Sequence, residues 1–215
     1  MAKKSKEKIK VAFPHMGNIY VAWGSALRRL GVEPYIPPYS SKRTLSLGTK
    51  NSPESICLPY KLILGNFIEA IEGGADYVAM ISSPGICRLG EYGAGIQNTL
   101  EDMGYHANYI ELQLYDGKNP VTIIRAIVFA FRKVFAADRM ENLLSYYRAR
   151  EVKVGDAEKA FKKGMKLIYE ANHYSELKKA EKQAKEMITK VEIDPKREVL
   201  HVDLTGEIYM VQDPF

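Results

Sequence analysis

The chain has 215 residues, of which 46% are hydrophobic, and a formal net charge of +5 at pH 7. This composition is ordinary for a soluble globular protein with a real core, and it excludes a secreted disulfide scaffold because only two residues are cysteine. Much of the positive excess lies in residues 1–8, which we expect to form a flexible basic leader, so the charge indicates no nucleic-acid partner. No apolar run approaches the roughly 18 residues that span a bilayer, and we expect a cytoplasmic protein without a membrane partner.

The first fifty residues predict a βαβ unit followed by a short helix. The alternating segment 8–13 predicts a strand, and apolar residues at helical spacing predict a helix over 19–30. A second strand is expected over 32–36, where two prolines close it. The polar segment 41–50 predicts a short helix.

The next fifty residues repeat the alternation of helix and strand. A helix is expected from Ser52, a candidate N-cap, to residue 73, with an interruption at Pro59. The segment 76–81 predicts a third strand, and a glycine-bounded helix is expected over 93–103.

The second half of the chain predicts long helices between two strands. A fourth strand is expected over 107–114, and Pro120 opens a long helix. A second long helix is expected over 156–191, with a thin apolar seam that suits a partly exposed helix in search of a partner. The alternating segment 198–204 predicts a fifth strand. The apolar stripe of the first long helix is formed by Ile124, Ile127, Val128, Phe131, Val134 and Phe135.

Alternation of strands and helices with glycine stops is typical of a parallel sheet covered on both faces. The expected fold class is α/β, with a Rossmann-like or flavodoxin-like, mostly parallel sheet and a long-helix appendage. Beyond the leader, we expect an α/β domain at 9–118 that carries both cysteines and a long helical segment at 119–193. Residues 194–215 would form a terminal strand and a Gly-Glu-Ile-Tyr turn that leads into a second domain.

The two cysteines, Cys57 and Cys87, are the first candidates for chemistry. Cys57 precedes an apolar helical segment, and Cys87 lies in a Pro/Gly loop after the third strand, so both can reach the carboxyl edge of the sheet, where open α/β sheets hold their sites. In a reducing compartment, paired cysteines favour metal or redox chemistry over a disulfide. The alternative is that both are small core residues, since free cysteine is among the most buried residue types.

Other cysteine chemistries have weaker signals in this sequence. Structural zinc needs four close ligands, and no Cys-x-x-Cys pair is present. A nucleophilic cysteine could use His15 or His106 as its base, but neither lies in a recognisable motif. Arg88, next to Cys87, would stabilise a thiolate.

Three segments together carry a resemblance to a known family: Glu54-Ser-Ile-Cys57-Leu-Pro59-Tyr-Lys61, Gly85-Ile-Cys87-Arg88-Leu-Gly90-Glu-Tyr92 and Gly206-Glu207-Ile-Tyr209. In these segments the chain resembles 2-hydroxyacyl-CoA dehydratases and the proteins related to their activases. The likeness covers nearly the whole chain outside the long helices, and its specificity comes from the three segments in combination. Because that family continues past the Gly-Glu-Ile-Tyr segment, the resemblance implies that this chain is an N-terminal portion.

The resemblance implies an iron-sulfur protein of anaerobic metabolism. Cys57 and Cys87 match the first two ligands of a [4Fe-4S] cluster, or a related iron-sulfur cluster, held between Rossmann-like domains. The family's third cysteine is missing here. The resemblance then implies a cluster shared with a sister subunit or in a homodimer, a non-protein third or fourth ligand, or a truncated or degenerate relative. The implied activity is that of an (R)-2-hydroxyacyl-CoA dehydratase-like lyase or a related reductase component, with an acyl-CoA substrate.

A separate ATP-dependent activator protein is implied as a partner, and this chain has no Walker motif of its own. Polar residues around the motifs are expected to support the site. We expect Arg88, Tyr92 and Glu207 to contact or tune the cofactor, with Glu207 arriving on a neighbouring strand end. Glu54, Lys61 and Glu91 lie beside the same motifs, where helix capping and simple solvation are the alternatives.

Two other functions stay open at the level of sequence. The chain could be a non-catalytic subunit that lends two thiolates to a partner's cluster. It could also be a CoA-binding or nucleotide-binding α/β module with structural cysteines, in which case the protein purified without oxygen would be colourless.

Overall fold

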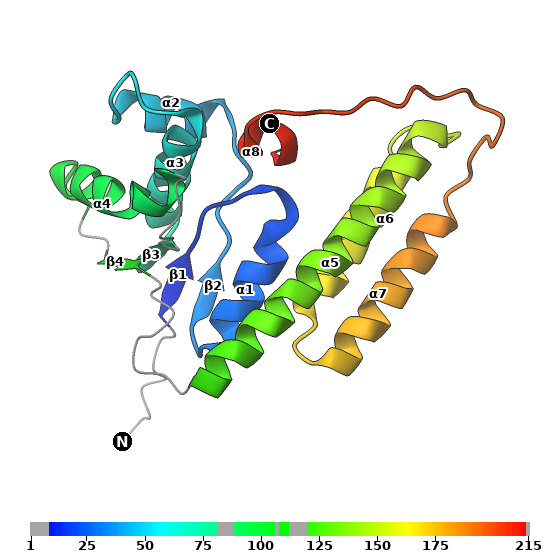
Figure 1. Ribbon diagram of the computed structural model, residues 1–215, viewed down its shortest axis with the longest axis horizontal. Coiled ribbons are helices and arrows are strands. Elements are labelled where there is room, and N and C mark those ends of the chain that lie inside the picture. The colour runs from blue at the N-terminus through cyan, green and yellow to red at the C-terminus, as the bar shows by residue number, and fades with distance from the viewer. Residues whose placement is uncertain (1–8, 81–87, 106–107, 112–119, 214–215) are drawn as a thin grey trace.

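The structure is a computed structural model in which residues 9–80, 88–105, 108–111 and 120–213 are described. Figure 1 shows an α/β unit on one side and a group of three long helices on the other, with the C-terminal segment returning to the α/β unit. Within the described ranges, no helix combines the length and the apolar character needed to cross a membrane.

Four short strands form a single parallel sheet. They are β1 (Lys10–Ala12), β2 (Glu33–Tyr35), β3 (Tyr77–Met80) and β4 (Asn108–Glu111), and their order is β2-β1-β3-β4. The chain moves outward from β1 to β2 and then crosses to the other side of β1, so the order reverses between β1 and β3. At such a switch point the loops after the strands diverge and leave room for ligands. The predicted α/β class and four of the predicted strands are confirmed.

Helices cover both faces of this sheet. α1 (Tyr20–Arg29) packs over one face, and α3 (Leu58–Glu72) and α4 (Tyr92–Asp102) pack over the other. Because successive strand residues point to opposite faces, neighbouring residues of β1 enter different cores. Val11 packs with Leu27 of α1, whereas the next residue, Ala12, belongs to the core of α3 and α4.

α2 (Lys42–Lys50) lies directly on α3, and glycines permit the close approach. Its N-cap is Ser41, whose side chain accepts from the N–H of Thr44 in a capping box. A Cβ at Gly48 would collide with the backbone carbonyl of Lys61 on α3. The short helix expected at 41–50 is therefore confirmed, and its position is set by backbone contact.

The start of α3 corrects the sequence-based prediction. The helix begins at Leu58, its N-cap is Cys57, and Pro59 lies in its first turn. Pro59 does not interrupt the helix, because proline lacks only an N–H that has no intrahelical partner in the first turn. Ser52 precedes the helix and does not cap it.

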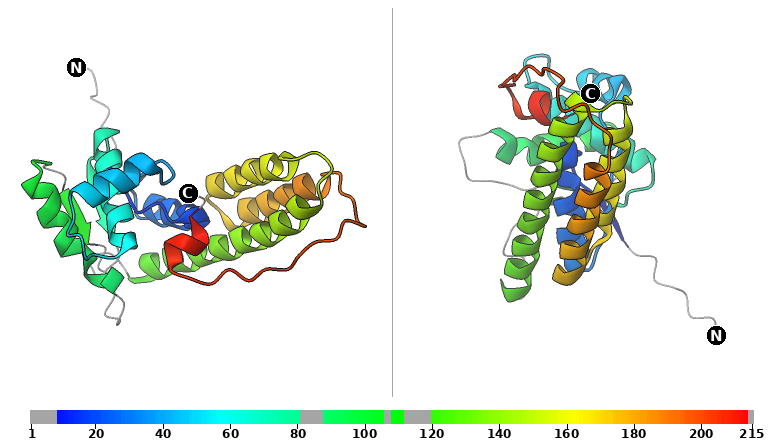
Figure 2. Two further views of the ribbon diagram at one scale, coloured as in Figure 1. Left: turned by 90° about the horizontal axis from the view of Figure 1, so that it is seen from above. Right: turned by 90° about the vertical axis from the view of Figure 1, so that its right-hand side faces the viewer.

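The long helices form a bundle beside α1. They are α5 (Pro120–Arg150), α6 (Asp156–Glu170) and α7 (Tyr174–Thr189), and Figure 2 shows them lying alongside one another. The prediction of one helix over 156–191 is wrong, because the chain turns after α6 and His173 becomes the N-cap of α7. Part of the predicted seam of α7 is buried within the chain, namely Leu177, Ala180, Ala184 and Ile188, whereas its other members, Tyr174 and Met187, are exposed.

A buried carboxylate fixes the turn between α5 and α6. Glu151 is 3% exposed, and its two oxygens accept from the N–H groups of Gly155 at 2.6 Å and Ala157 at 2.8 Å. These donors hold the pKa of Glu151 below its usual range. The carboxylate also lies at the N-terminus of α6, where the helix dipole favours negative charge.

α5 presents apolar side chains on two sides. Its inner face packs on α1, α6 and α7 and includes Lys133, which is 0% exposed. Its outer face carries the stripe predicted from the sequence, much of which faces solvent. The exposed apolar residues are Val121, Ile124, Val128, Phe131 and Phe135.

The segment 198–204 is not a strand. It forms an extended coil that leads from α7 back to the α/β unit (Figure 1), with Leu200 93% exposed and Val202 80% exposed. Its alternating pattern suits a strand, but in this chain it meets no edge of the described sheet. The coil ends in a short helix, α8 (Ile208–Gln212), which packs against α3 and the turn after β1.

Candidate functional site

Cys57 lies at the N-terminus of α3 with a free, partly exposed thiol. Its backbone is extended, so the side chain stands outside the helix beside the first turn. The sulfur hydrogen-bonds to the phenol of Tyr92, the first residue of α4. This contact places the phenol beside the sulfur, and the expected role of Tyr92 toward a cofactor stays a prediction.

Aromatic packing holds the Tyr92 ring in place. Tyr92 is buried and meets the ring of Tyr60 at 5.2 Å in an edge-to-face arrangement. Tyr60 comes from α3 and lies within hydrogen-bonding distance of Thr99 on α4, 3.3 Å between their oxygens. The two helices that carry Cys57 and Tyr92 are thus joined next to the thiol.

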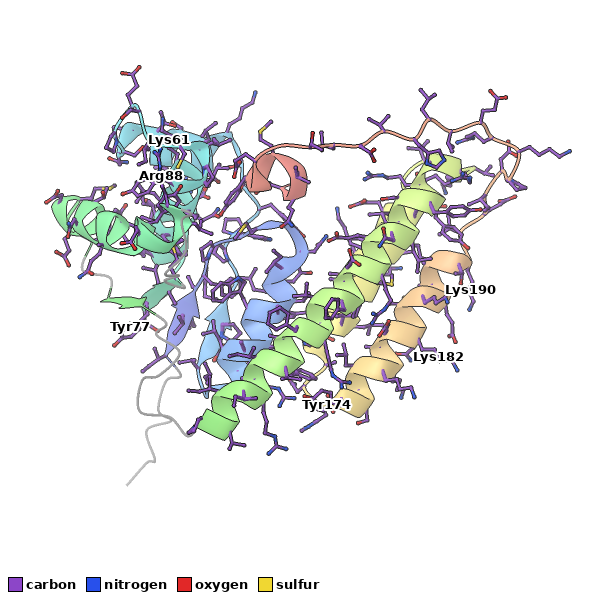
Figure 3. The ribbon with its side chains drawn as sticks, viewed as in Figure 1. Lys61, Tyr77, Arg88, Tyr174, Lys182 and Lys190 are labelled. Carbon is purple, nitrogen blue, oxygen red and sulfur yellow. The ribbon has the colours of Figure 1, made fainter. Side chains whose placement is uncertain are left out.

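The charged residues of the cysteine motifs have different roles. Arg88 begins the 3-10 turn η2 (Arg88–Glu91) and is exposed, as is Glu91. The amine of Lys61 donates to the backbone carbonyl of Glu54 at 3.0 Å, so it closes the turn before Cys57. Figure 3 labels Lys61 and Arg88 at the α2, α3 and α4 end of the molecule. Cys87 lies outside the described residues.

The Gly-Glu-Ile-Tyr segment comes to the same region by way of α8. The side chain of Glu207 caps α8, where it accepts from the N–H of Tyr209 at 3.1 Å. Glu207 therefore begins a helix and does not follow a strand, which corrects the predicted position. Tyr209 is 2% exposed and packs in the core that includes Tyr92 and contacts Cys57. Two distant motifs of the sequence thus share one core.

α8 is held by two further contacts. Ser40, after β2, donates to the Asp213 carboxylate at 2.6 Å. Gly17 lies so close to the carbonyl of Gln212 that a Cβ would collide with it. α8 thereby packs on the loops at the carboxyl ends of β1 and β2.

His15 is buried at the carboxyl end of β1, where the sequence offers no motif. Its Nδ1 lies 2.6 Å from the carbonyl of Pro37, and its ring packs at 4.3 Å from that of Tyr39. Burial lowers the pKa of His15, so the ring is neutral and Nδ1 carries the proton. The sequence allows His15 as a base for a cysteine, but the structure records no contact between it and Cys57.

Asn66 is a site residue that the sequence analysis missed. It lies inside α3, is 0% exposed, and accepts from the N–H of His15 at 3.2 Å. A lone amide within the apolar run Leu62 to Ile68 is the signal that could have found it, because buried polar side chains need partners.

The thiol of Cys57 has the donor chemistry of an iron-sulfur ligand, since thiolates hold such clusters. Among the described residues, no group of three or more His, Cys, Asp or Glu side chains is arranged to hold a metal ion. The described part of one chain thus offers a single sulfur ligand. The residues fit a cluster only where other thiolates complete the set.

Comparison with known families gives one match. The family described as CoA enzyme activase uncharacterised domain matches residues 12–215, which run from the last residue of β1 through α8. No curated protein and no solved structure matches the chain.

Proposed function

Because the chain belongs to the family of CoA enzyme activase uncharacterised domains, we propose that it is a cluster-binding component of a CoA-linked enzyme system. In this proposal Cys57 and Cys87 supply thiolates to a [4Fe-4S] or related iron-sulfur cluster. When bound, such a cluster supplies one-electron transfer at low potential. The chemistry served would be dehydration or reduction of an acyl-CoA.

The observation that carries the proposal is the setting of Cys57. Its thiol is free and partly exposed at the start of a helix, and a buried phenol hydrogen-bonds to it. A thiol kept only to fill a core would be buried among apolar side chains. Thiolate is the form of cysteine that binds metals, and a metal-bound Cys57 sulfur could accept a hydrogen bond from the Tyr92 phenol.

Tyr92 and Arg88 have distinct roles in this proposal. With Cys57 as a metal-bound thiolate, the Tyr92 phenol would donate to the sulfur and withdraw electron density from it, as outer-shell hydrogen bonds do at metal sites. Arg88 is exposed next in sequence to Cys87, where its positive charge would stabilise a second thiolate.

The count of cysteines implies a partner. A four-iron cluster takes four thiolates, whereas this chain contains two cysteines. A homodimer would supply 2 × 2 = 4, and a sister subunit could complete the set in another way. A separate ATP-dependent activator would deliver the electron, because the sequence contains no Walker motif.

The test is the iron and acid-labile sulfide content after purification without oxygen. We expect the wild-type protein to be brown and the variants Cys57→Ser and Cys87→Ser to lose most of the iron. Ser55→Ala, an exposed neighbour of Cys57, should keep the wild-type content. A colourless wild-type protein that also resists reconstitution with iron and sulfide would refute the proposal.

A second candidate function follows from the strand order. The switch point between β1 and β3 is where open α/β sheets bind nucleotides, so the chain could be a CoA-binding or nucleotide-binding module with structural cysteines. In that case calorimetry with CoA would show binding, and Cys57→Ser would leave it unchanged.

A further inference from the structure

Four buried polar atoms at or near α8 have no hydrogen-bond partner among the described residues: His15 Nε2, Asn66 Nδ2, Tyr209 Oη, and Oε2 of Glu207, the N-cap of α8. The side chains of His15, Asn66 and Tyr209 belong to residues that are 3%, 0% and 2% exposed, so bulk solvent does not supply their missing partners. Buried polar groups of native proteins are nearly always paired. A cluster of unpaired ones therefore indicates that something else supplies the partners.

These atoms come from three elements that meet at one place. His15 follows β1, and its N–H donates to the amide of Asn66 on α3, the same amide that carries the unpaired Nδ2. Tyr209 comes from α8, which packs on α3 and on the turn after His15. Met16 and Tyr209 share one core cluster. The meeting point lies at the carboxyl end of β1, beside the reversal of strand order between β1 and β3.

The unpaired atoms define what they can bind. Nδ1 of His15 donates to the carbonyl of Pro37, so Nε2 is an acceptor, whereas Asn66 Nδ2 and Tyr209 Oη are donors. A complementary molecule needs an oxygen that accepts and a hydroxyl or N–H that donates. The carboxylates of Asp213 and Glu207 act on Tyr209, where they add to burial in raising the pKa of the phenol. Negative charge at this place disfavours an anion.

We propose that His15, Asn66 and Tyr209 form a binding site for a small uncharged molecule that carries a carbonyl oxygen and a hydroxyl or amide N–H. The donors of Asn66 and Tyr209 bind the carbonyl oxygen, and Nε2 of His15 accepts from the hydroxyl or N–H. The site does not depend on the proposed cluster, because none of its groups is a cysteine.

α8 is the cover of this site. It is a five-residue helix fixed by the Tyr209 ring, by the hydrogen bond from Ser40 to Asp213, and by the close approach at Gly17. The coil that precedes it is exposed, with Leu204 68% exposed. In this proposal α8 moves aside to admit a ligand, and its main contacts with the rest of the chain, on α3 and the turn after β1, do not include the strands.

The experiment uses glycolamide, which has an amide carbonyl and a hydroxyl, with the full chain. The imidazole ¹⁵N signal of His15 is assigned by replacing the other three histidines in turn, since the chain has four. We expect glycolamide to move the Nε2 signal saturably, with a dissociation constant on the order of millimolar for so small a ligand. Tyr209→Phe keeps the ring and should weaken binding about 3- to 10-fold.

Two controls test whether glycolamide binds at the unpaired atoms of His15, Asn66 and Tyr209. Tyr39→Phe changes a ring that packs on His15 but keeps these atoms, so binding should be unchanged. Acetate, which carries a charge, should bind more weakly than glycolamide. The proposal is overturned if glycolamide leaves the His15 signal unmoved, which would indicate that buried water alone pairs these atoms, or if Tyr209→Phe binds it as tightly as wild type.

Discussion

Replacing Lys133 with methionine should remove a rise in stability that the wild-type chain shows as the pH increases above neutrality. Lys133 is 0% exposed on the inner face of α5, and its amine donates to the carbonyl of Tyr169 at 2.9 Å. Burial is the main cause that lowers its pKa from 10.5 to about 7, and the nearby guanidinium groups of Arg28 and Arg29 add to the effect. The folded chain thus holds a neutral amine where the unfolded chain holds an ammonium.

The sign and size of the effect follow from proton linkage. Between the two pKa values the unfolded state binds more protons, so the free energy of unfolding increases with pH. Each pH unit contributes about 1.4 kcal/mol, and a rise from pH 7 to about pH 10 contributes about 4 kcal/mol. Below pH 7 both states are protonated and the contribution no longer changes. Lys133→Met leaves the Tyr169 carbonyl paired, because Arg28 also donates to it at 3.1 Å.

Urea unfolding at a series of pH values from about 6.5 to about 9.5 measures this contribution. As the pH rises, the free energy of unfolding of wild type should increase steadily relative to that of Lys133→Met. Lys163→Met, an exposed change on α6, should give a curve parallel to that of wild type. Parallel curves for Lys133→Met and wild type would refute the reasoning, since they would mean that the amine stays charged in the folded chain.

Three further changes test other contacts. Tyr92→Phe removes the hydrogen bond to Cys57 and should slow alkylation of that thiol several-fold at neutral pH in a Cys87→Ser background, whereas Tyr60→Phe should not. Gly48→Ala should lower the free energy of unfolding by about 3 kcal/mol or more, because its Cβ collides with α3, while Gly206→Ala, whose Cβ makes only ordinary van der Waals contact with Met210 and Val211, should cost far less. Glu151→Gln should destabilise the chain by about 1–3 kcal/mol at neutral pH, and the difference from wild type in urea unfolding should shrink below about pH 4, where protonation removes the wild-type carboxylate's advantage. A pH-independent deficit for Glu151→Gln would contradict that account.

Local sequence patterns correctly predicted those elements whose periodicity and end signals lie within the element itself. The strands at 8–13 and 76–81 alternate and end at turn residues, and the sheet is built from them as expected. The break between α6 and α7 was missed because Ala171-Asn-His173 contains neither glycine nor proline. The prediction of a strand at 198–204 was wrong for another reason. An alternating segment forms a strand only where it can pair with a sheet, and this segment does not pair with the described sheet.

In the candidate site, too, local features could be predicted from the sequence and long-range contacts could not. The cysteine motif was visible in the sequence, and the position of Cys57 at a helix entrance was predicted, although the first turn was misplaced. The contact between Cys57 and Tyr92 joins residues 35 positions apart, and that between His15 and Asn66 spans 51. Such contacts depend on how α3 and α4 pack over the sheet, which no local periodicity encodes.

Because α5 has two apolar sides, its rotation about its own axis needs an explanation beyond apolar burial. The outer stripe, with Phe131 and Phe135, is apolar as well, so a rotated helix would also bury large apolar side chains. Hydrophobicity therefore gives the helix little preference between the two orientations. The preference comes from directional contacts: the hydrogen bond from Lys133 to Tyr169, and the guanidinium of Arg29 stacked 3.8 Å from the Phe129 ring. In α5, the polar groups specify a single rotation of the helix about its axis. The apolar surface stabilises packing but does not specify that rotation.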